Sequence, residues 1–480
     1  MGTLFAALNT ASNSMNTLEE AIGVVQNNVT NASTPGYVTQ TLNLTANPFN
    51  ANDNLWGGVE ASGVQSARDV YAEQAVWSAN QQAGLATQQT NSLSSLQDYF
   101  DVSGSTGIPA ALSSLYSAFS AWSSDPTDAT DRQQVINAAT NLSQTFNGTS
   151  QSVQQLRSQA GQQLSTTVGQ INQYTAQIAQ INDEIRHGGS NNSGLQTQLY
   201  NTLEELSNVA PISVQTESDG TATVLLGGQS PLVIGTTQNA LQLSYPSSAN
   251  PTYPGGTPNA VLLNAQGQDV TSLADQGTLG GLLQFRNTTL PAVIGSDQQQ
   301  GSLNQLAQGV ADRVNTILAS GDVSSGPPAV AGIPLFSYAS ASATAVAGTL
   351  SLNSSISSSQ LAAIAPGPPV VANGTAAQLA GLATPASAAD MINGLSYTDF
   401  YSNIAAGIGN LESAASANET AQTDLLAQAQ NMRAQVSGVS LDAQATNLLQ
   451  FQDSYQAAAQ LISTVNTMTQ SLLTTMQDLH

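Results

Sequence analysis

Apolar side chains near the N-terminus recur at alternating steps of four and three residues. Leu4, Leu8, Leu18, Ile22 and Val25 all fall on this series. The spacing matches the seam of a helix that carries a single apolar stripe. It predicts one amphipathic helix at the start of the chain, which must bury its stripe against another element.

The C-terminal segment keeps the same spacing from Leu441 to Leu479, so a second single-stripe helix is expected there. At 1.5 Å per residue this helix would be about 58 Å long. Its seam contains Leu441, Leu448, Phe451, Tyr455, Ile462, Val465 and Leu472.

Both terminal segments are almost free of charge, since no Arg lies in residues 1–67 or 434–480. One interpretation is a coiled coil between the two helices of one chain. Solvent-facing coiled coils, however, usually carry charge pairs beside the seam. Their absence favours burial of the outer faces against neighbouring copies. We therefore expect the seam residues of both helices to form an assembly interface.

A third periodic run extends from Val135 to Ile185. Its helix would start near Asp125-Pro126 and reach a length of about 90 Å. A shorter helical piece follows over 195–209. Alternation with period two then begins at Ile212, and Asp219-Gly220 between two such runs predicts a β-hairpin.

Helical spacing returns over 279–318 and again near Met391. Residues 323–389 contain no charged side chain, and we expect β-structure and loops there.

The order of these elements predicts a mainly α fold with a β-rich insert and discontinuous, nested domains. The terminal helices would form a coiled coil, long helices a bundle in the middle layer, and the insert a β-rich outer domain. The expected parts are a terminal coiled-coil domain (1–50 and 440–480), a helical rod-like domain (51–210, 275–320 and 390–439), and a β-rich and loop outer region (211–274 and 321–389).

The composition of the chain excludes several classes of binding partner. The 480 residues include seven Arg, no Lys and 30 acidic residues, which gives a formal net charge of −23. A nucleic-acid partner is excluded because phosphates require a basic surface, and an anionic membrane surface is disfavoured for the same reason. The sequence has no long apolar run and its first residues lack a cationic region, so we expect neither a membrane span nor a Sec-type signal.

The sequence contains few residues that could carry catalysis or bind a metal ion. The chain has no Cys, and its two His residues are His187, at the end of a predicted helix, and His480, the last residue. No nucleotide-binding or metal-binding spacing occurs. We therefore expect no catalytic residues, no cofactor, no metal site and no enzymatic activity.

The end of the first predicted helix carries a recognisable motif. Pro35 cannot continue the helix and Gly36 accepts turn geometry. The stretch Asn31-Ala32-Ser33-Thr34-Pro35-Gly36-Tyr37 resembles the N-terminal signature of bacterial flagellar axial proteins, the superfamily of rod, hook and hook-associated proteins. The motif residues are Asn31, Thr34, Pro35, Gly36 and Tyr37. The segment 437–457, with Phe451-Gln452 and Tyr455-Gln456-Ala457, resembles the matching C-terminal signature.

Three internal segments resemble one family within that superfamily, the hook-associated protein 1 family that joins hook and filament. They are residues 112–119, residues 227–233 and Leu279-Gly280-Gly281-Leu282-Leu283-Gln284-Phe285-Arg286. The resemblance covers roughly residues 1–315 and 395–480, and leaves out the charge-free middle.

The resemblance implies a structural protein of the extracellular flagellum that leaves the cell through the flagellar type III export apparatus. It implies self-assembly into a ring between hook and filament, with the hook protein and the second hook-filament junction protein as partners. An export chaperone would hold the C-terminal segment. No cofactor, nucleic acid or membrane partner is implied.

The chain departs from the family pattern at Thr39, Ser440 and Ala443-Gln444, where relatives commonly carry basic, Asn or acidic residues. Two alternatives stay open at this point. One is another axial component, such as the hook protein or the second junction protein. The other is a secreted acidic binding module.

Overall fold

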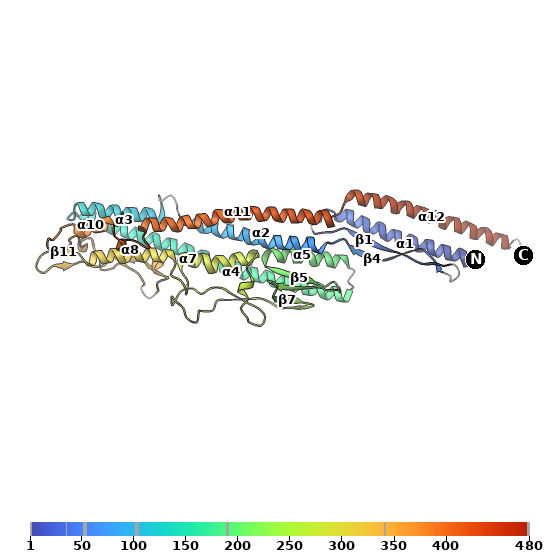
Figure 1. Ribbon diagram of the computed structural model, residues 1–480, viewed down its shortest axis with the longest axis horizontal. Coiled ribbons are helices and arrows are strands. Elements are labelled where there is room, and N and C mark those ends of the chain that lie inside the picture. Colours follow the sequence, from blue (N-terminus) through green and yellow to red (C-terminus); the bar gives the residue numbers. More distant parts are fainter. Residues whose placement is uncertain are drawn as a thin grey trace.

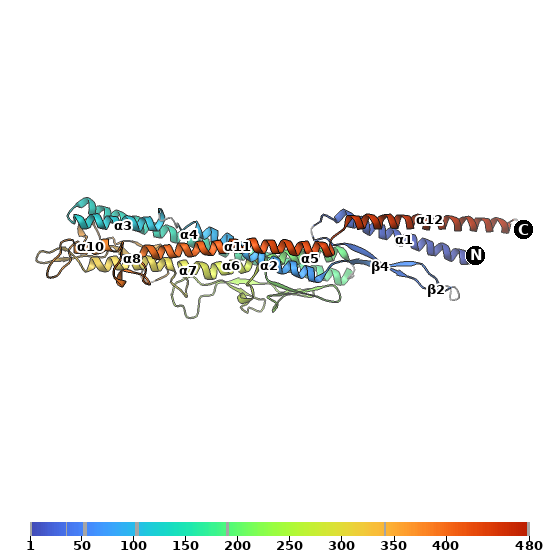
Figure 2. The ribbon, with the colours of Figure 1, turned by 45° about the horizontal axis from the view of Figure 1, so that its top comes forward.

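The protein is an elongated helical molecule with both chain ends at the same end (Figure 1). The computed structural model describes residues 2–34, 36–50, 55–100, 105–188, 192–339 and 342–477. Long helices run along the whole length, and small sheets lie against them (Figure 2). The predicted mainly α fold with a β-rich insert is confirmed.

The longest helix, α4 (Ala129–Gly188), confirms the run predicted from Val135 to Ile185. Around it lie α2 (Val70–Gln97), α3 (Gly107–Ser124), α5 (Ser193–Val209) and α11 (Tyr397–Ser437). The stripe of α4 is buried along its length: Val135, Leu142, Phe146, Leu164 and Ile171 are each 0% exposed. The helix can therefore be this long because its neighbours cover the stripe throughout.

Two apolar clusters follow one another along α4. The first joins the N-terminal half of α4 to α3, α8 (Ser302–Ala319) and the start of α11. The second joins the C-terminal half to α5 and the neighbouring sheet. One helix thus provides a wall for both cores.

The helical stretch expected over 279–318 is interrupted in the structure. It consists of α6 (Gly277–Gln284), a π-helical segment η3 (Phe285–Thr289), α7 (Leu290–Ile294) and then α8. The break lies between Gly295 and Gly301, whose φ angles are 84° and 82°. A Cβ on Gly301 would lie 2.2 Å from the Gly295 nitrogen. The helix is interrupted here because these two glycines allow a loop that is too tight for other residues.

The predicted hairpin around Asp219-Gly220 is confirmed. β5 (Ile212–Thr216) pairs antiparallel with β6 (Ala222–Leu226), from Ile212 opposite Leu226 to Thr216 opposite Ala222. β7 (Ser230–Ile234) and β8 (Thr237–Gln238) extend the sheet in the order β5-β6-β7-β8. Beyond it, β9 (Gln242–Ser244) pairs with β10 (Val261–Leu263). Alternate residues of β6 are buried in the second core, so this sheet has one face on the helices.

The charge-free middle lies at the far end of the molecule from the termini (Figure 1). Its strands are short pairs, β11 (Asp322–Ser324) with β12 (Val330–Ala331) and β13 (Phe336–Ser337) with β14 (Ser351–Leu352). It also contains two helices, α9 (Val346–Thr349) and α10 (Gly374–Gly381), and α10 packs on α3. The two stretches expected to be β-rich, 211–274 and 321–389, therefore lie at different places along the bundle.

The termini form a separate layer. It consists of α1 (Gly2–Asn31), α12 (Leu441–Gln477) and an antiparallel hairpin of β1 (Gln40–Ala46) and β4 (Val59–Ser66), with the short pair β2 (Phe49–Asn50) and β3 (Leu55–Trp56) near its tip. Residues 51–69 were expected in the helical part, but strands β3 and β4 accompany α1 instead. In β4 the apolar positions change face between Ala61 and Val64, and this shift hid the period of two.

Candidate assembly surface

The terminal helices α1 and α12 pack against each other along their length (Figures 1 and 2). Small side chains of α1 allow the close approach: Ala11, Ala21 and Val25 are 8%, 1% and 4% exposed. On α12, Val465 is 9% exposed. The two stripes therefore meet within one chain.

The seam residues predicted from sequence divide into three groups. Val25 and Val465 are buried between the helices. Leu441 and Leu472 are exposed, at 55% and 44%. The other members are half-buried: Leu4, Leu8, Leu18, Ile22, Leu448, Phe451, Tyr455 and Ile462.

A second set of apolar side chains on α12 has no cover among the described residues. Leu461, Met468 and Leu472 are 50%, 55% and 44% exposed. Their spacing of seven and four places them on one side of the helix, beside the stripe that faces α1. We call these three residues the apolar flank of α12. The sequence analysis found only Leu472 of the three.

A buried amide fixes the turn that follows α1. Asn28 is 0% exposed, and its side chain donates to the Gln40 carbonyl at 2.8 Å and to Gln444 Oε1 of α12 at 3.1 Å. Its Oδ1 accepts from the Gln40 backbone N–H and the Tyr37 hydroxyl, both at 2.9 Å. Asn28 thus joins α1, the motif and α12. In the sequence Asn28 stands beside Val29 rather than on the apolar series, so the spacing gave no signal for it.

The family motif forms the loop around this amide. Asn31 is the last residue of α1 and its side chain donates to the Asn27 carbonyl at 3.0 Å, while the Thr34 N–H donates to the Asn31 carbonyl at 2.9 Å. Burial raises the pKa of the Tyr37 hydroxyl. Pro35 lies outside the described residues.

Gly36 is required by its geometry. Its φ is 71°, and a Cβ there would lie 1.9 Å from the Asn201 Oδ1 of α5. The Gly36 carbonyl also accepts a hydrogen bond from Arg68 Nη2 at 3.0 Å. The motif loop therefore touches the helical bundle at this residue.

An ionic network lies where the terminal layer meets the bundle. Glu73 of α2, 1% exposed, accepts from Arg68 and from Arg433 Nη1, the latter at 3.1 Å. Arg433 of α11 also donates to Glu204 of α5 at 2.6 Å. Burial alone would lower the pKa of Arg433, but the hydrogen bond and charge of Glu204, with Glu73, raise it. The network ties three helices to the segment before α2.

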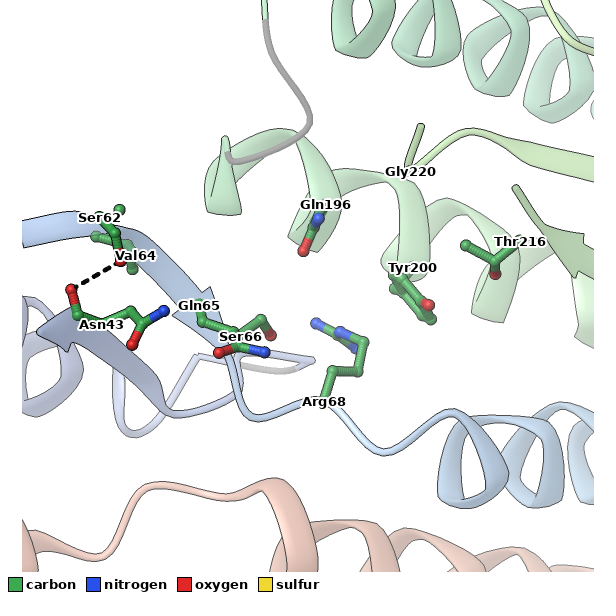
Figure 3. Close-up of a pocket in the computed structure, with 11 residues that line it drawn as sticks. Asn43, Ser62, Val64, Gln65, Ser66, Arg68, Gln196, Tyr200, Thr216 and Gly220 are labelled. Carbon is green, nitrogen blue, oxygen red and sulfur yellow. Dashed lines mark hydrogen bonds between the residues drawn. The ribbon is translucent and has the colours of Figure 1, made fainter. Parts of the chain in front are cut away.

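Arg68 lines a cleft of about 450 Å³ between the β1–β4 hairpin and α5 (Figure 3). Its guanidinium points towards Tyr200 and lies 4.2 Å above the centre of that ring. Ser62 and Gln65 of β4 form the opposite wall. The position of Arg68 thus couples hairpin, motif loop and bundle. Sequence reasoning missed Arg68, Glu73 and Arg433 because their partners are distant in the chain.

The residues that depart from the family pattern make local contacts of their own. Thr39 donates from its backbone N–H to the Ser437 carbonyl at 2.9 Å and from its hydroxyl to the Gly438 carbonyl at 2.8 Å. Ser440 accepts from the Ala443 N–H at the start of α12, and Gln444 binds Asn28. Neutral hydrogen bonds therefore occupy these positions in this chain.

Comparison with family models gives two matches. Residues 93–336 match the flagellar hook-associated protein FlgK helical domain, which is half of the chain. Residues 433–475, which contain α12, match the flagellar basal body rod FlgEFG protein C-terminal model. The chain belongs to the FlgK family of flagellar hook-associated proteins.

Individual relatives agree with this FlgK assignment. The chain is 28% identical to flagellar hook-associated protein 1 of Salmonella typhimurium over 317 residues, 64% of this chain and 55% of that protein. It thus spans about half the length of that relative. Over 501 residues it is 24% identical to flagellar hook-associated protein 1 of Bacillus subtilis, which covers 96% of each chain. The predicted family resemblance is confirmed.

A solved structure shows the same fold. The flagellar hook junction protein FlgK from Burkholderia pseudomallei superposes with a TM-score of 0.64 at 19% identity, covering 75% of this chain and 99% of that one. The internal segments that resemble the FlgK family, including residues 279–286, all lie inside the region matched by the helical-domain model.

Two further properties concern the described residues. No helix among them is long and apolar enough to cross a membrane. No group of three or more His, Asp or Glu side chains among them is placed to hold a metal ion.

Proposed function

We propose that the protein is a structural subunit of the bacterial flagellum that forms the junction ring between hook and filament. The observation that carries this proposal is the apolar flank of α12 on a chain of the FlgK family. An exposed apolar row beside a paired stripe marks a surface that a neighbouring molecule covers. Copies of the same chain are the proposed neighbours within the ring.

The proposed interface consists of the predicted seam residues together with the flank. Inside one chain the seam holds α1 and α12 together, and Leu441, Leu461, Met468 and Leu472 remain for contacts between chains. Burial of apolar area would drive association, while the low charge of both helices avoids desolvation of ions. The hook protein and the second junction protein are the proposed partners at the two ends of the ring.

A division into layers supports this role. The terminal layer would pack in the core of the flagellum, and the helical bundle with its sheet would lie outside it. The proposed terminal domain is 1–50 and 440–480, with the β1–β4 hairpin to residue 66 added to it because β4 packs along α1. The proposed helical domain keeps α2 to α5, α8 and α11, and the segments 211–274 and 321–389 form its outer additions.

The proposed location is the extracellular flagellum, reached through the flagellar type III export apparatus. An export chaperone would hold α12 before assembly, because its uncovered apolar side chains need protection from aggregation. The role is non-enzymatic in this proposal. The membership of the chain in a family of structural flagellar proteins supports it.

Deletion of the gene tests the proposal by electron microscopy. We expect complete hooks without filaments, with filament subunits lost to the medium, because no adaptor would start the filament lattice. Normal filaments would reject the junction role, and missing hooks would favour another axial role.

Complementation tests the surface. Met468→Asp in the flank should fail to restore filaments, because a carboxylate would enter a buried apolar contact. Gln470→Asp, on the opposite side of α12, is the matched control and should restore them. Export of both variants is measured in the medium. If Met468→Asp is retained in the cell, assembly of purified protein decides, and full assembly would contradict the proposed interface.

A further inference from the structure

A polar cleft of about 550 Å³ opens beside the middle of α4, far from the terminal layer. Arg157 of α4 and Arg286 of the π-helical segment η3 both line it. The other polar or aromatic side chains that line it are Gln154, Ser158, Gln162, Ser165, Tyr245 and Thr257. Among the residues that line this cleft there is no carboxylate.

Both arginine residues are more than nine-tenths buried. Arg157 and Arg286 are 9% and 7% exposed, and the Nε of each is buried without a hydrogen-bond partner. Arg157 donates from Nη2 to the Gly295 carbonyl. Arg286 donates from Nη1 to the Pro258 carbonyl at 3.1 Å and to the Asn287 side chain at 3.4 Å, and it lies 4.4 Å above the Tyr245 ring. These partners are neutral.

Three partly buried arginines elsewhere in the described chain are neutralised. Arg68, Arg313 and Arg433 each make an ion pair with a carboxylate. In the described part of the chain, Arg157 and Arg286 make none. Two adjacent positive charges without a counter-charge are costly to bury. Consistently, burial and the charge of Arg286 lower the pKa of Arg157 to about 10.

Asp297 is the acidic residue beside this region, two positions after Gly295. Its Oδ2 accepts from the Ser248 backbone N–H at 3.1 Å and from the Ser248 hydroxyl. It forms no ion pair with either guanidinium. If Asp297 is counted as the counter-charge of one guanidinium, the other guanidinium still has none. This positive charge is local, because the net charge of the whole protein is −23.

We propose that this cleft binds an oxyanion, held between Arg157 and Arg286. A carboxylate or phosphate-type group accepts several charge-assisted hydrogen bonds at once, which is the geometry that guanidinium groups recognise. The hydroxyl groups of Ser158, Ser165 and Thr257 are further donors in the cleft. A π-helical segment is uncommon and often marks a functional site, and here it carries Arg286.

Such a group has two sources: a dissolved anion, or the side chain of an Asp or Glu on a second copy of this chain. The first arm of the test is calorimetric titration of the full chain with phosphate, sulfate and citrate against chloride at constant ionic strength. A dissolved ligand should bind one site per chain. Arg157→Gln and Arg286→Gln should each weaken it at least tenfold. Arg186→Gln, which removes an exposed ion pair with Asp219, is the matched control and should leave the affinity unchanged.

The second arm measures self-association of the same proteins by sedimentation over a range of concentrations. If no small anion binds, at least tenfold weaker self-association of both cleft variants, and not of Arg186→Gln, supports a carboxylate from a second copy. Thermal melting of the free variants adds a control for folding. Without anion, removal of either buried charge should leave the melting temperature equal or higher. The proposal is overturned if neither anion affinity nor self-association responds to the two cleft variants.

Discussion

The helices α4 and α12 carry the same kind of apolar stripe, but only α12 leaves large apolar side chains exposed beside it. α4 has 60 residues, and its stripe is buried from Val135 to Ile185 by α3, α5, α6, α9 and the sheet. α12 has 37 residues and packs on α1 alone, with Leu461, Met468 and Leu472 left exposed. The difference shows that periodicity reveals which side chains need cover. It does not reveal whether the cover comes from the same chain.

The largest expected effect comes from one phenylalanine in each helix. Phe146 of α4 is 0% exposed, and Phe146→Ala should lower the free energy of unfolding by about 3–5 kcal/mol, from lost burial and the cavity left behind. Phe451→Ala in the half-buried seam of α12 should lower it by about 1 kcal/mol or less. Denaturant titration followed by circular dichroism measures both. Equal losses would contradict the view that α12 is incompletely covered in the monomer.

A charge placed in the terminal seam should separate the two regions further. Leu448→Asp or Ile462→Asp puts an unpaired carboxylate between α1 and α12 and should cost several kcal/mol in the assembled ring. In the monomer we expect faster hydrogen exchange in α1 and α12 and an unchanged melting temperature for the bundle. A large drop in that temperature would show that the terminal pair and the bundle unfold as one unit.

The smallest expected effect is the response to alkaline pH. Burial, with minor contributions from nearby charges, raises the pKa of Tyr397 to about 12, whereas a hydrogen bond to Glu19 raises the pKa of the half-buried Tyr455. The unfolded pKa is about 10, so the folded state favours the protonated phenol. The resulting stability is complete below pH 10 and is lost as the pH rises towards 12.

Thermal melts between pH 9 and 11.5 check this expectation. Tyr397→Phe should make the loss of stability with rising pH shallower, after correction for its loss of the hydrogen bond to the Gly309 carbonyl. Tyr455→Phe should leave the slope for the bundle unchanged. The opposite ranking would mean that the terminal pair contributes more to global stability than its burial indicates.

Long elements were predictable because their signals are local and repeated. The helix from Val135 to Ile185 was predicted from a continuous apolar seam. The hairpin at Asp219-Gly220 was predicted from a turn sequence between two alternating runs. The break between Gly295 and Gly301 was not predicted, because apolar spacing continues across it and only the close approach of two backbones requires glycine there. The β1–β4 hairpin was missed because the alternation is clear only in β1, whereas in β4 the apolar positions change face between Ala61 and Val64.

The candidate site was also predictable in part, because the apolar spacing of the terminal helices is a local and repeated signal. The apolar spacing located the two helices α1 and α12. It did not show which side of α12 is exposed, because that depends on what α1 leaves uncovered. The network of Arg68, Glu73 and Arg433 joins residues more than 300 positions apart, and no spacing in the sequence reports such a meeting. Asn28 was not predicted either, because it stands beside the seam position Val29 and its partner Gln444 is distant in the chain.

The connections between the terminal layer and the bundle have a mechanical consequence. The chain passes from one layer to the other twice, before α2 and after α11, and both passages are cross-linked at the same level. Ser437 accepts from the Thr39 N–H at 2.9 Å and from the Asp69 N–H at 3.1 Å, and the Ala67 N–H donates to the Thr39 carbonyl at 2.8 Å. A twisting load applied to the terminal helices would therefore be divided between two parallel, hydrogen-bonded strands of backbone. In the flagellar role proposed above, that arrangement would transmit torque without concentrating it on a single connection.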